Sequence, residues 1–155
     1  MAIAPQRPPA PRPTTRTFLG MTTLGPWALM IEPNGWHGVN ENKALPTSAG
    51  TRWISHYDNA NANDDGSLLW AEDTELQLHF ELRHADYRSG TRAGDLLAVI
   101  RRLGFTFPDE PTEVEDELAV PAAFAFALAE HLTGIPVTPV LLQDTTFICG
   151  TADFR

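Results

Sequence analysis

A strict alternation of apolar and polar residues over positions 75–82 constrains the fold of this chain more than any other feature. The apolar members are Leu76, Leu78, Phe80 and Leu82, and the polar members are Glu75, Gln77, His79 and Glu81. A period of two places the two sets on opposite faces of a β-strand. We therefore expect an antiparallel sheet with one face against the core and the other toward water.

Further strands and two helices are expected on either side of this segment. The expected strands cover residues 17–22, 27–31, 52–57, 67–71 and 145–149. Apolar residues at helical spacing predict helices over 92–103 and 121–133, which stop before Gly104 and Gly134. The pattern predicts an α+β fold, with an antiparallel sheet of about five or six strands and two main helices packed on one face.

The first 17 residues differ in composition from the rest. They contain five of the 13 prolines, and proline fixes φ and removes a backbone donor. We expect residues 1–17 to be a Pro-rich disordered tail. Residues 18–155 have the length and the hydrophobic content of a single α+β domain.

The charge of the chain restricts its partners and its location. The net charge is −9, and the tail carries three arginines and no acid, so positions 18–155 hold 8 basic and 20 acidic residues. Because phosphate backbones are bound by Lys and Arg, we expect no nucleic-acid partner; a protein with a basic surface fits better. No apolar run is long enough for a membrane helix. The acidity also predicts no membrane partner. The single cysteine, Cys149, fits a reducing, cytoplasmic compartment, and its apolar surroundings in the sequence predict a buried thiol.

Known catalytic and cofactor motifs are missing from the sequence. Neither G-x-S-x-G nor a phosphate-binding glycine loop occurs, so we expect no cofactor. Asn61–Glu72 resembles a calcium loop, except that Asn61 replaces the first Asp. Its flanks read as strands, whereas calcium loops join two helices. An Asx-rich loop without a metal is the preferred interpretation, and the sequence leaves cation binding there open.

Two sets of residues are candidate sites. Trp36 follows the turn residues Asn34 and Gly35, and we expect Asn34, Trp36 and His37 to border a partner-binding surface. His56 and His79 both lie on predicted strands, where they would line a polar pocket on the sheet face. The first set favours a non-catalytic protein-interaction module, and the second a small enzyme or ligand-binding domain.

Several segments together resemble a known family. These segments are Trp27–Trp36, Ser48–Arg52, Asn59–Ala62, Leu78–Glu81, Ala125–Gly134 and Val137–Gly150. Their order is similar to that of domain-of-unknown-function family 6461, which is bacterial. The resemblance implies no activity and no catalytic residues. It is compatible with an accessory or immunity-type interaction module. We expect this function in preference to that of an enzyme.

Overall fold

The computed structural model describes residues 16–33, 35–58, 66–82, 88–95, 98–99, 102–103 and 121–153. Its strands are β1 (Arg16–Leu24), β2 (Trp27–Ile31), β3 (Arg52–Tyr57), β4 (Ser67–Glu72), β5 (Glu75–Glu81), β6 (Arg88–Ser89) and β7 (Ile148–Asp153). Its helices are the 3-10 turn η1 (His37–Val39), α1 (Glu41–Thr47), α3 (Pro121–Thr133) and α4 (Pro139–Asp144). The α+β class is confirmed. Arg16 and Thr17, expected in the tail, belong to β1, and residues 1–15 lie outside the described part.

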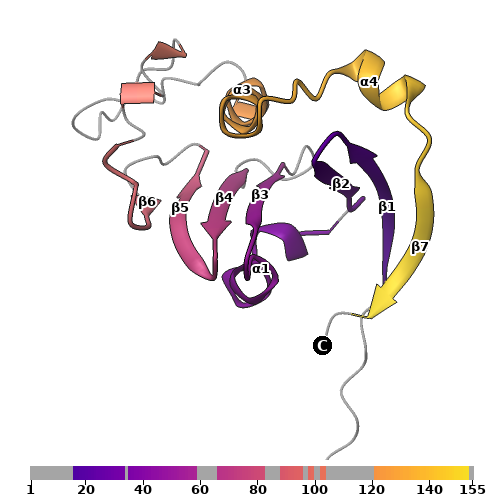
Figure 1. Ribbon diagram of the computed structural model, residues 1–155, viewed down its shortest axis with the longest axis horizontal. Helices are drawn as coiled ribbons and strands as arrows, with labels where there is room; N and C mark the ends of the chain where they lie inside the picture. The colour runs from indigo at the N-terminus through magenta and orange to yellow at the C-terminus, as the bar shows by residue number, and fades with distance from the viewer. Residues whose placement is uncertain are drawn as a thin grey trace, which may run out of the picture.

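The described strands form two antiparallel sheets, so the expected single sheet of five or six strands is not confirmed. One sheet has the order β2-β1-β7 and the other β3-β4-β5-β6 (Figure 1). After β2 the chain passes through η1 and α1, and β3 then pairs with β4. The C-terminal β7 pairs with the free side of β1, from Arg16 opposite Asp153 to Met21 opposite Ile148.

The main core lies between α3 and one face of the four-stranded sheet. Its buried members are Leu68, Trp70, Leu78, Phe80, Leu82, Phe124, Ala125 and Leu128. Each large aliphatic side chain buried there contributes about 1.5 to 3 kcal/mol. Val99 and Leu103, from the helix predicted over 92–103, pack against the same cluster. Of that helix, residues 92–95 form a turn, and the remaining described positions are only 98–99 and 102–103.

The opposite face of this sheet is also covered, which differs from the expected wet face. Val39 of η1 and Ala44 of α1 pack on Leu69 and Ala71 of β4. Four consecutive residues of β4, 68–71, are buried, so this strand is apolar toward both sides. The four-stranded sheet is therefore a middle layer between α3 and α1.

A bulge changes the alternation in β5. Trp70 pairs with Leu78, but Ala71 pairs with Leu76, so one extra residue, Gln77, is inserted into β5. The insertion turns Leu76 to the α1 side, where it packs with Ala71, while Leu78 stays on the α3 side. The strand prediction was correct, but the four apolar residues do not share one face.

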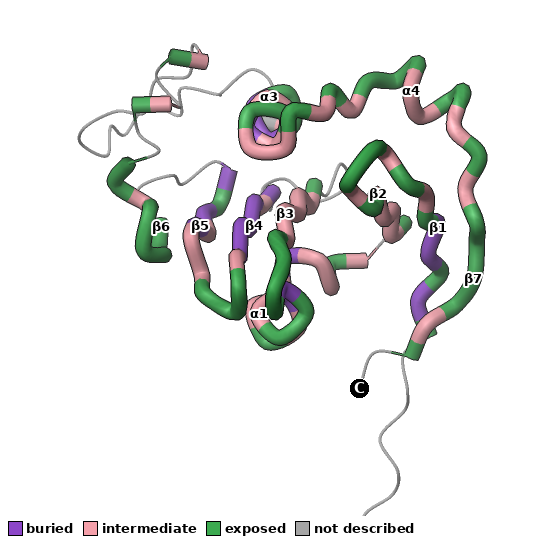
Figure 2. The backbone as a smooth tube through the Cα atoms, in the orientation of Figure 1, coloured by how far each residue is buried: buried purple, intermediate pink, exposed green. Residues whose placement is uncertain are grey.

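The three-stranded sheet is more exposed than the four-stranded one. Figure 2 shows β7 and α4 as largely exposed, and Ile148 in β7 is 82% exposed. Cys149 is exposed as well, so the prediction of a buried thiol is wrong. The apolar run around it forms an outer strand of a thin sheet, where an apolar side chain is not necessarily covered. No helix in the described ranges is long and apolar enough to cross a membrane.

Candidate functional site

Trp36 is the most exposed aromatic side chain in the described part of the chain. Trp36 lies between β2 and η1 in the chain and is 57% exposed. The ring stacks on the imidazole of His37, with 6.2 Å between centroids and 19° between planes. The sequence predicted an exposed Trp36 beside His37, and the structure shows both. Asn34, the third member of that predicted surface, lies outside the described residues.

A buried carboxylate holds His37 in place. Glu32, at the end of β2, accepts a hydrogen bond from the His37 backbone N–H at 3.0 Å and forms a second contact with the His37 Nδ1. Only 8% of the Glu32 side chain is exposed, compared with 17% for His37. A Cβ added to Gly35 would overlap the Glu32 carboxylate, so Glu32 keeps its contacts with His37 only with glycine at position 35.

Two side chains of β3 fasten η1 to the sheet. The indole N–H of Trp53 donates to the backbone carbonyl of Gly38 at 2.8 Å, and the Ser55 hydroxyl donates to the same carbonyl. A Cβ on Gly38 would approach Ser55 to 3.2 Å. The turn that carries Trp36 is therefore fixed at both of its ends, by β2 and by β3.

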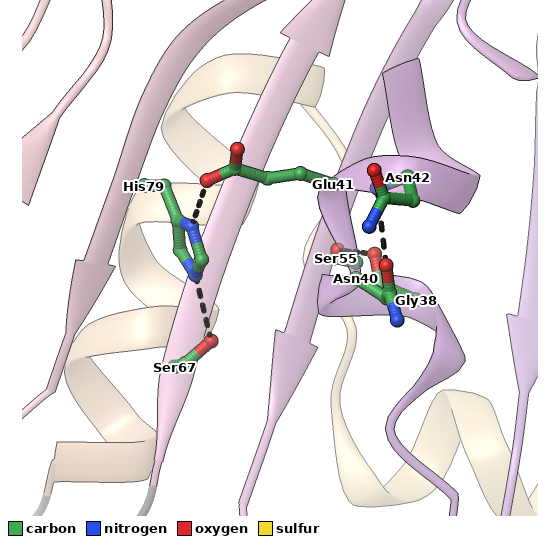
Figure 3. Close-up of polar contacts among 7 residues, drawn as sticks. All are labelled: Gly38, Asn40, Glu41, Asn42, Ser55, Ser67 and His79. Atoms are coloured by element: carbon green, nitrogen blue, oxygen red, sulfur yellow. Dashed lines mark hydrogen bonds and ion pairs between the residues drawn. The ribbon is translucent and has the colours of Figure 1, made fainter. Parts of the chain in front are cut away.

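A second polar arrangement lies on the α1 face of the four-stranded sheet (Figure 3). The Nδ1 of His79 in β5 is 2.6 Å from Glu41 Oε1 at the start of α1. The Nε2 of the same ring is 3.4 Å from the Ser67 hydroxyl oxygen at the start of β4. Glu41 and Ser67 lie 38 and 12 residues from His79 along the chain, so the sequence pattern indicated His79 but gave no signal for Glu41.

His56 does not join this arrangement. It pairs with Leu68 of β4, whereas His79 pairs with Leu69, and adjacent residues of one strand point to opposite faces. His56 packs edge-on against Phe126 of α3, with 5.2 Å between ring centroids. The expected pocket around both histidines therefore does not form from these two side chains.

Burial determines the charge state of His56. Desolvation lowers the pKa of its imidazole below 6.5, and the nearby Asp58 partly offsets this by raising it. Among the described residues, its Nε2 is one of two buried side-chain nitrogens for which no hydrogen-bond partner is found, the other being the Trp70 Nε1. The half-buried His56 ring thus lies against α3 in surroundings that disfavour its charged form.

An open cleft separates the turn between β1 and β2 from the end of the four-stranded sheet. Its volume is about 540 Å³, and its walls include Pro26, Trp27, Arg52 and Glu72. The Arg52 Nε donates to Glu72 Oε1 at 3.0 Å. Glu72 closes the calcium-like pattern of the sequence, but here it ends β4 and pairs with Arg52. Residues 61–65 of that pattern lie outside the described part.

Ser48, directly after α1, stabilises the fold through its hydroxyl group. Ser48 is fully buried; its hydroxyl donates to the Leu45 carbonyl at 2.8 Å and accepts from the Thr74 backbone N–H at 3.0 Å. The next turn is tied to the same hairpin, because the Gly50 N–H donates to Asp73 Oδ1. Asp73 and Thr74 both have positive φ, 49° and 68°, as a two-residue hairpin turn requires. Within the described residues no group of three or more His, Cys, Asp or Glu side chains is arranged to hold a metal ion.

Comparison with known proteins gives one assignment. Neither the curated proteins nor the solved structures provide a match to this chain. A family model does match, over residues 6–155, which is nearly the whole chain. The resemblance found in the sequence is thus confirmed, and the chain belongs to the family of unknown function DUF6461.

Proposed function

We propose that this chain is a non-catalytic protein-interaction module of accessory or immunity type, which acts in the cytoplasm and binds its partner through Trp36. The observation that carries the proposal is the exposed Trp36 ring, stacked on His37 and held over a fixed turn. Tryptophan is enriched among the residues that dominate binding energy at protein interfaces.

The support beneath Trp36 favours binding because it reduces the entropy lost on association. Glu32 fixes the His37 ring, and Trp53 and Ser55 fix the carbonyl of Gly38. A side chain that is already ordered in the free protein loses less conformational entropy when a partner covers it. Trp36 differs in this support from Ile148, which is also exposed but lies on an outer strand.

The charge of the chain indicates the kind of partner. At a net charge of −9, the protein attracts a protein with a basic surface and repels nucleic acid. A Lys or Arg side chain of such a partner would be attracted to the face of the Trp36 ring by a cation–π interaction.

Affinity capture from a native lysate tests this function. The wild-type chain and the Trp36→Ala variant are immobilised in equal amounts, with Ile148→Ser as a control that removes another exposed apolar side chain. We expect a partner that the wild type and Ile148→Ser retain and Trp36→Ala loses. A capture with no protein above background, or with equal recovery by all three chains, contradicts the proposal.

A second candidate function is a small enzyme or ligand-binding domain that uses the polar α1 face around His79. The contacts of the two His79 ring nitrogens with Glu41 and Ser67 favour it. Fragment screening by NMR, observed at the His79 imidazole, tests this candidate. Fragments that shift His79 and Ser67 together support it, whereas a screen that leaves both unchanged argues against it.

A further inference from the structure

We propose that Ser67 is an activated nucleophile, that His79 is its general base, and that Glu41 orients this base, so that the site accepts acyl groups from activated esters. The inference rests on the second candidate function, the small enzyme or ligand-binding domain, and a positive result would replace the non-catalytic part of the first proposal while leaving the partner surface at Trp36 in place. Its substrate class follows from the order of the three groups, because a hydroxyl, an imidazole and a carboxylate in series are the arrangement that activates an oxygen nucleophile for acyl transfer.

The contact with Glu41 fixes the tautomer of His79. An ionised carboxylate only accepts hydrogen bonds, so at 2.6 Å from Glu41 Oε1 the Nδ1 of His79 must carry the proton. In the neutral imidazole, Nε2 then carries the lone pair, and the hydroxyl oxygen of Ser67 is 3.4 Å away from it. Such a distance is slightly longer than a good hydrogen bond, as is common for catalytic pairs without a bound substrate.

The three side chains come from three separate, packed elements. Ser67 begins β4, His79 lies in β5 and Glu41 begins α1 (Figure 3). Helix α1 packs across this sheet through Ala44. Leu69, the cross-strand partner of His79, is fully buried beside it on the same face of the sheet. The polar ends remain reachable, because 27% of the His79 side chain and 42% of the Glu41 side chain are exposed. The site is therefore rigid at its base and open toward solvent.

The acyl-transfer step balances with the groups present and an ester. The Ser67 oxygen attacks the carbonyl carbon while its proton passes to the Nε2 of His79, and the resulting imidazolium is stabilised by Glu41. The bond from carbon to the leaving oxygen then breaks, and that oxygen takes the proton from Nε2 and departs as an alcohol. Water completes the cycle by the same route, which releases the carboxylic acid and restores the Ser67 hydroxyl.

A fluorophosphonate probe and p-nitrophenyl acetate test the site directly. We expect the wild-type chain to be labelled at Ser67 and to release p-nitrophenol. His79→Gln and Ser67→Ala should lower both rates about 100-fold or more. The matched control is Ser89→Ala, because Ser89 in β6 is a cross-strand partner of His79 and is exposed. Its replacement should change the rates by no more than about two-fold.

Two results overturn the proposal: a wild-type chain that reacts no faster than Ser67→Ala, or labelling that maps to a serine other than Ser67. The ¹⁵N shifts of His79 in the wild-type chain give a second test that needs no variant. A proton on Nδ1 that moves to Nε2 in Glu41→Ala, and returns to Nδ1 in Glu41→Asp, supports the role of Glu41 as a positioning residue. A proton on Nε2 in the wild type contradicts it. Failure of these reactions leaves partner capture through Trp36 unaffected, so the two proposals fail separately.

Discussion

His56 and His79 lie on opposite faces of one four-stranded sheet, His56 against Phe126 of α3 and His79 beside Glu41 of α1. The strand register places them on opposite faces, because their cross-strand partners Leu68 and Leu69 are neighbours in β4. The two imidazoles therefore experience different surroundings. His56 is partly desolvated against α3 and has no hydrogen-bond partner on its Nε2, whereas His79 has a polar partner on each ring nitrogen.

The buried position of His56 predicts a loss of stability in mild acid. The pKa of His56 is lowered in the folded chain, so below pH 6.5 the unfolded chain binds a proton that the folded chain excludes. The free energy of unfolding should therefore fall as the pH drops below this value, until the folded state is protonated too. We expect His56→Phe to reduce this fall, as measured by urea unfolding between about pH 7.5 and about pH 5.5.

The matched control is His131→Gln, which removes an exposed histidine of α3. That variant should keep the wild-type dependence on pH. An equal fall in wild type and His56→Phe would show that other groups are responsible.

Gly35 allows Glu32 to reach His37, and this predicts the effect of a methyl group at position 35. In Gly35→Ala the new Cβ would overlap the Glu32 carboxylate and displace it from His37. Because the displaced carboxylate loses its hydrogen bonds to His37, we expect a loss of about 1 to 3 kcal/mol in the free energy of unfolding. Gly150→Ala is the control, because nothing lies within 4 Å of a Cβ at that position. Equal stabilities of the two variants in chemical denaturation would contradict the packing described here.

The hairpin between β4 and β5 carries backbone strain that a single exchange should relieve. Thr74 is β-branched and has φ of 68°, a left-handed conformation that glycine adopts readily. Thr74→Gly keeps the backbone N–H that donates to Ser48, so we expect a gain of about 0.5 to 1 kcal/mol.

Replacing threonine by glycine within a regular strand should lower the stability instead of raising it. Thr23 is exposed in β1, and Thr23→Gly should cost about 1 kcal/mol because glycine is unfavourable within a strand. Melting temperatures of both variants measure the contrast. A destabilised Thr74→Gly would show that the threonine side chain contributes more than its strain costs.

Local patterns in the sequence were sufficient to predict most described elements, but not how they are arranged. Alternation located β5, and the turn residues 34–35 indicated that Trp36 would be exposed. The bulge at Gln77 leaves no mark on periodicity, so the turning of Leu76 to the α1 side was missed. Cys149 was misjudged because an apolar run does not reveal whether anything covers its strand.

The candidate sites show the same limit. Glu32 and His37 are five residues apart, and the local sequence pattern indicated only His37. Glu41 reaches His79 only because α1 packs across β4 and β5, and this packing depends on contacts distant in sequence. Which histidines share a face depends on strand register, which a bulge or a different pairing would change.

The most direct test of the proposed function is the affinity of a captured partner for wild type, Trp36→Ala and Ile148→Ser, measured by calorimetry with matched samples. Loss of a central aromatic residue at an interface costs about 2 kcal/mol or more, which corresponds to roughly 30-fold in Kd. We expect Trp36→Ala to weaken binding by this factor while Ile148→Ser binds like the wild type. Equal affinities for wild type and Trp36→Ala would contradict Trp36 as the binding residue.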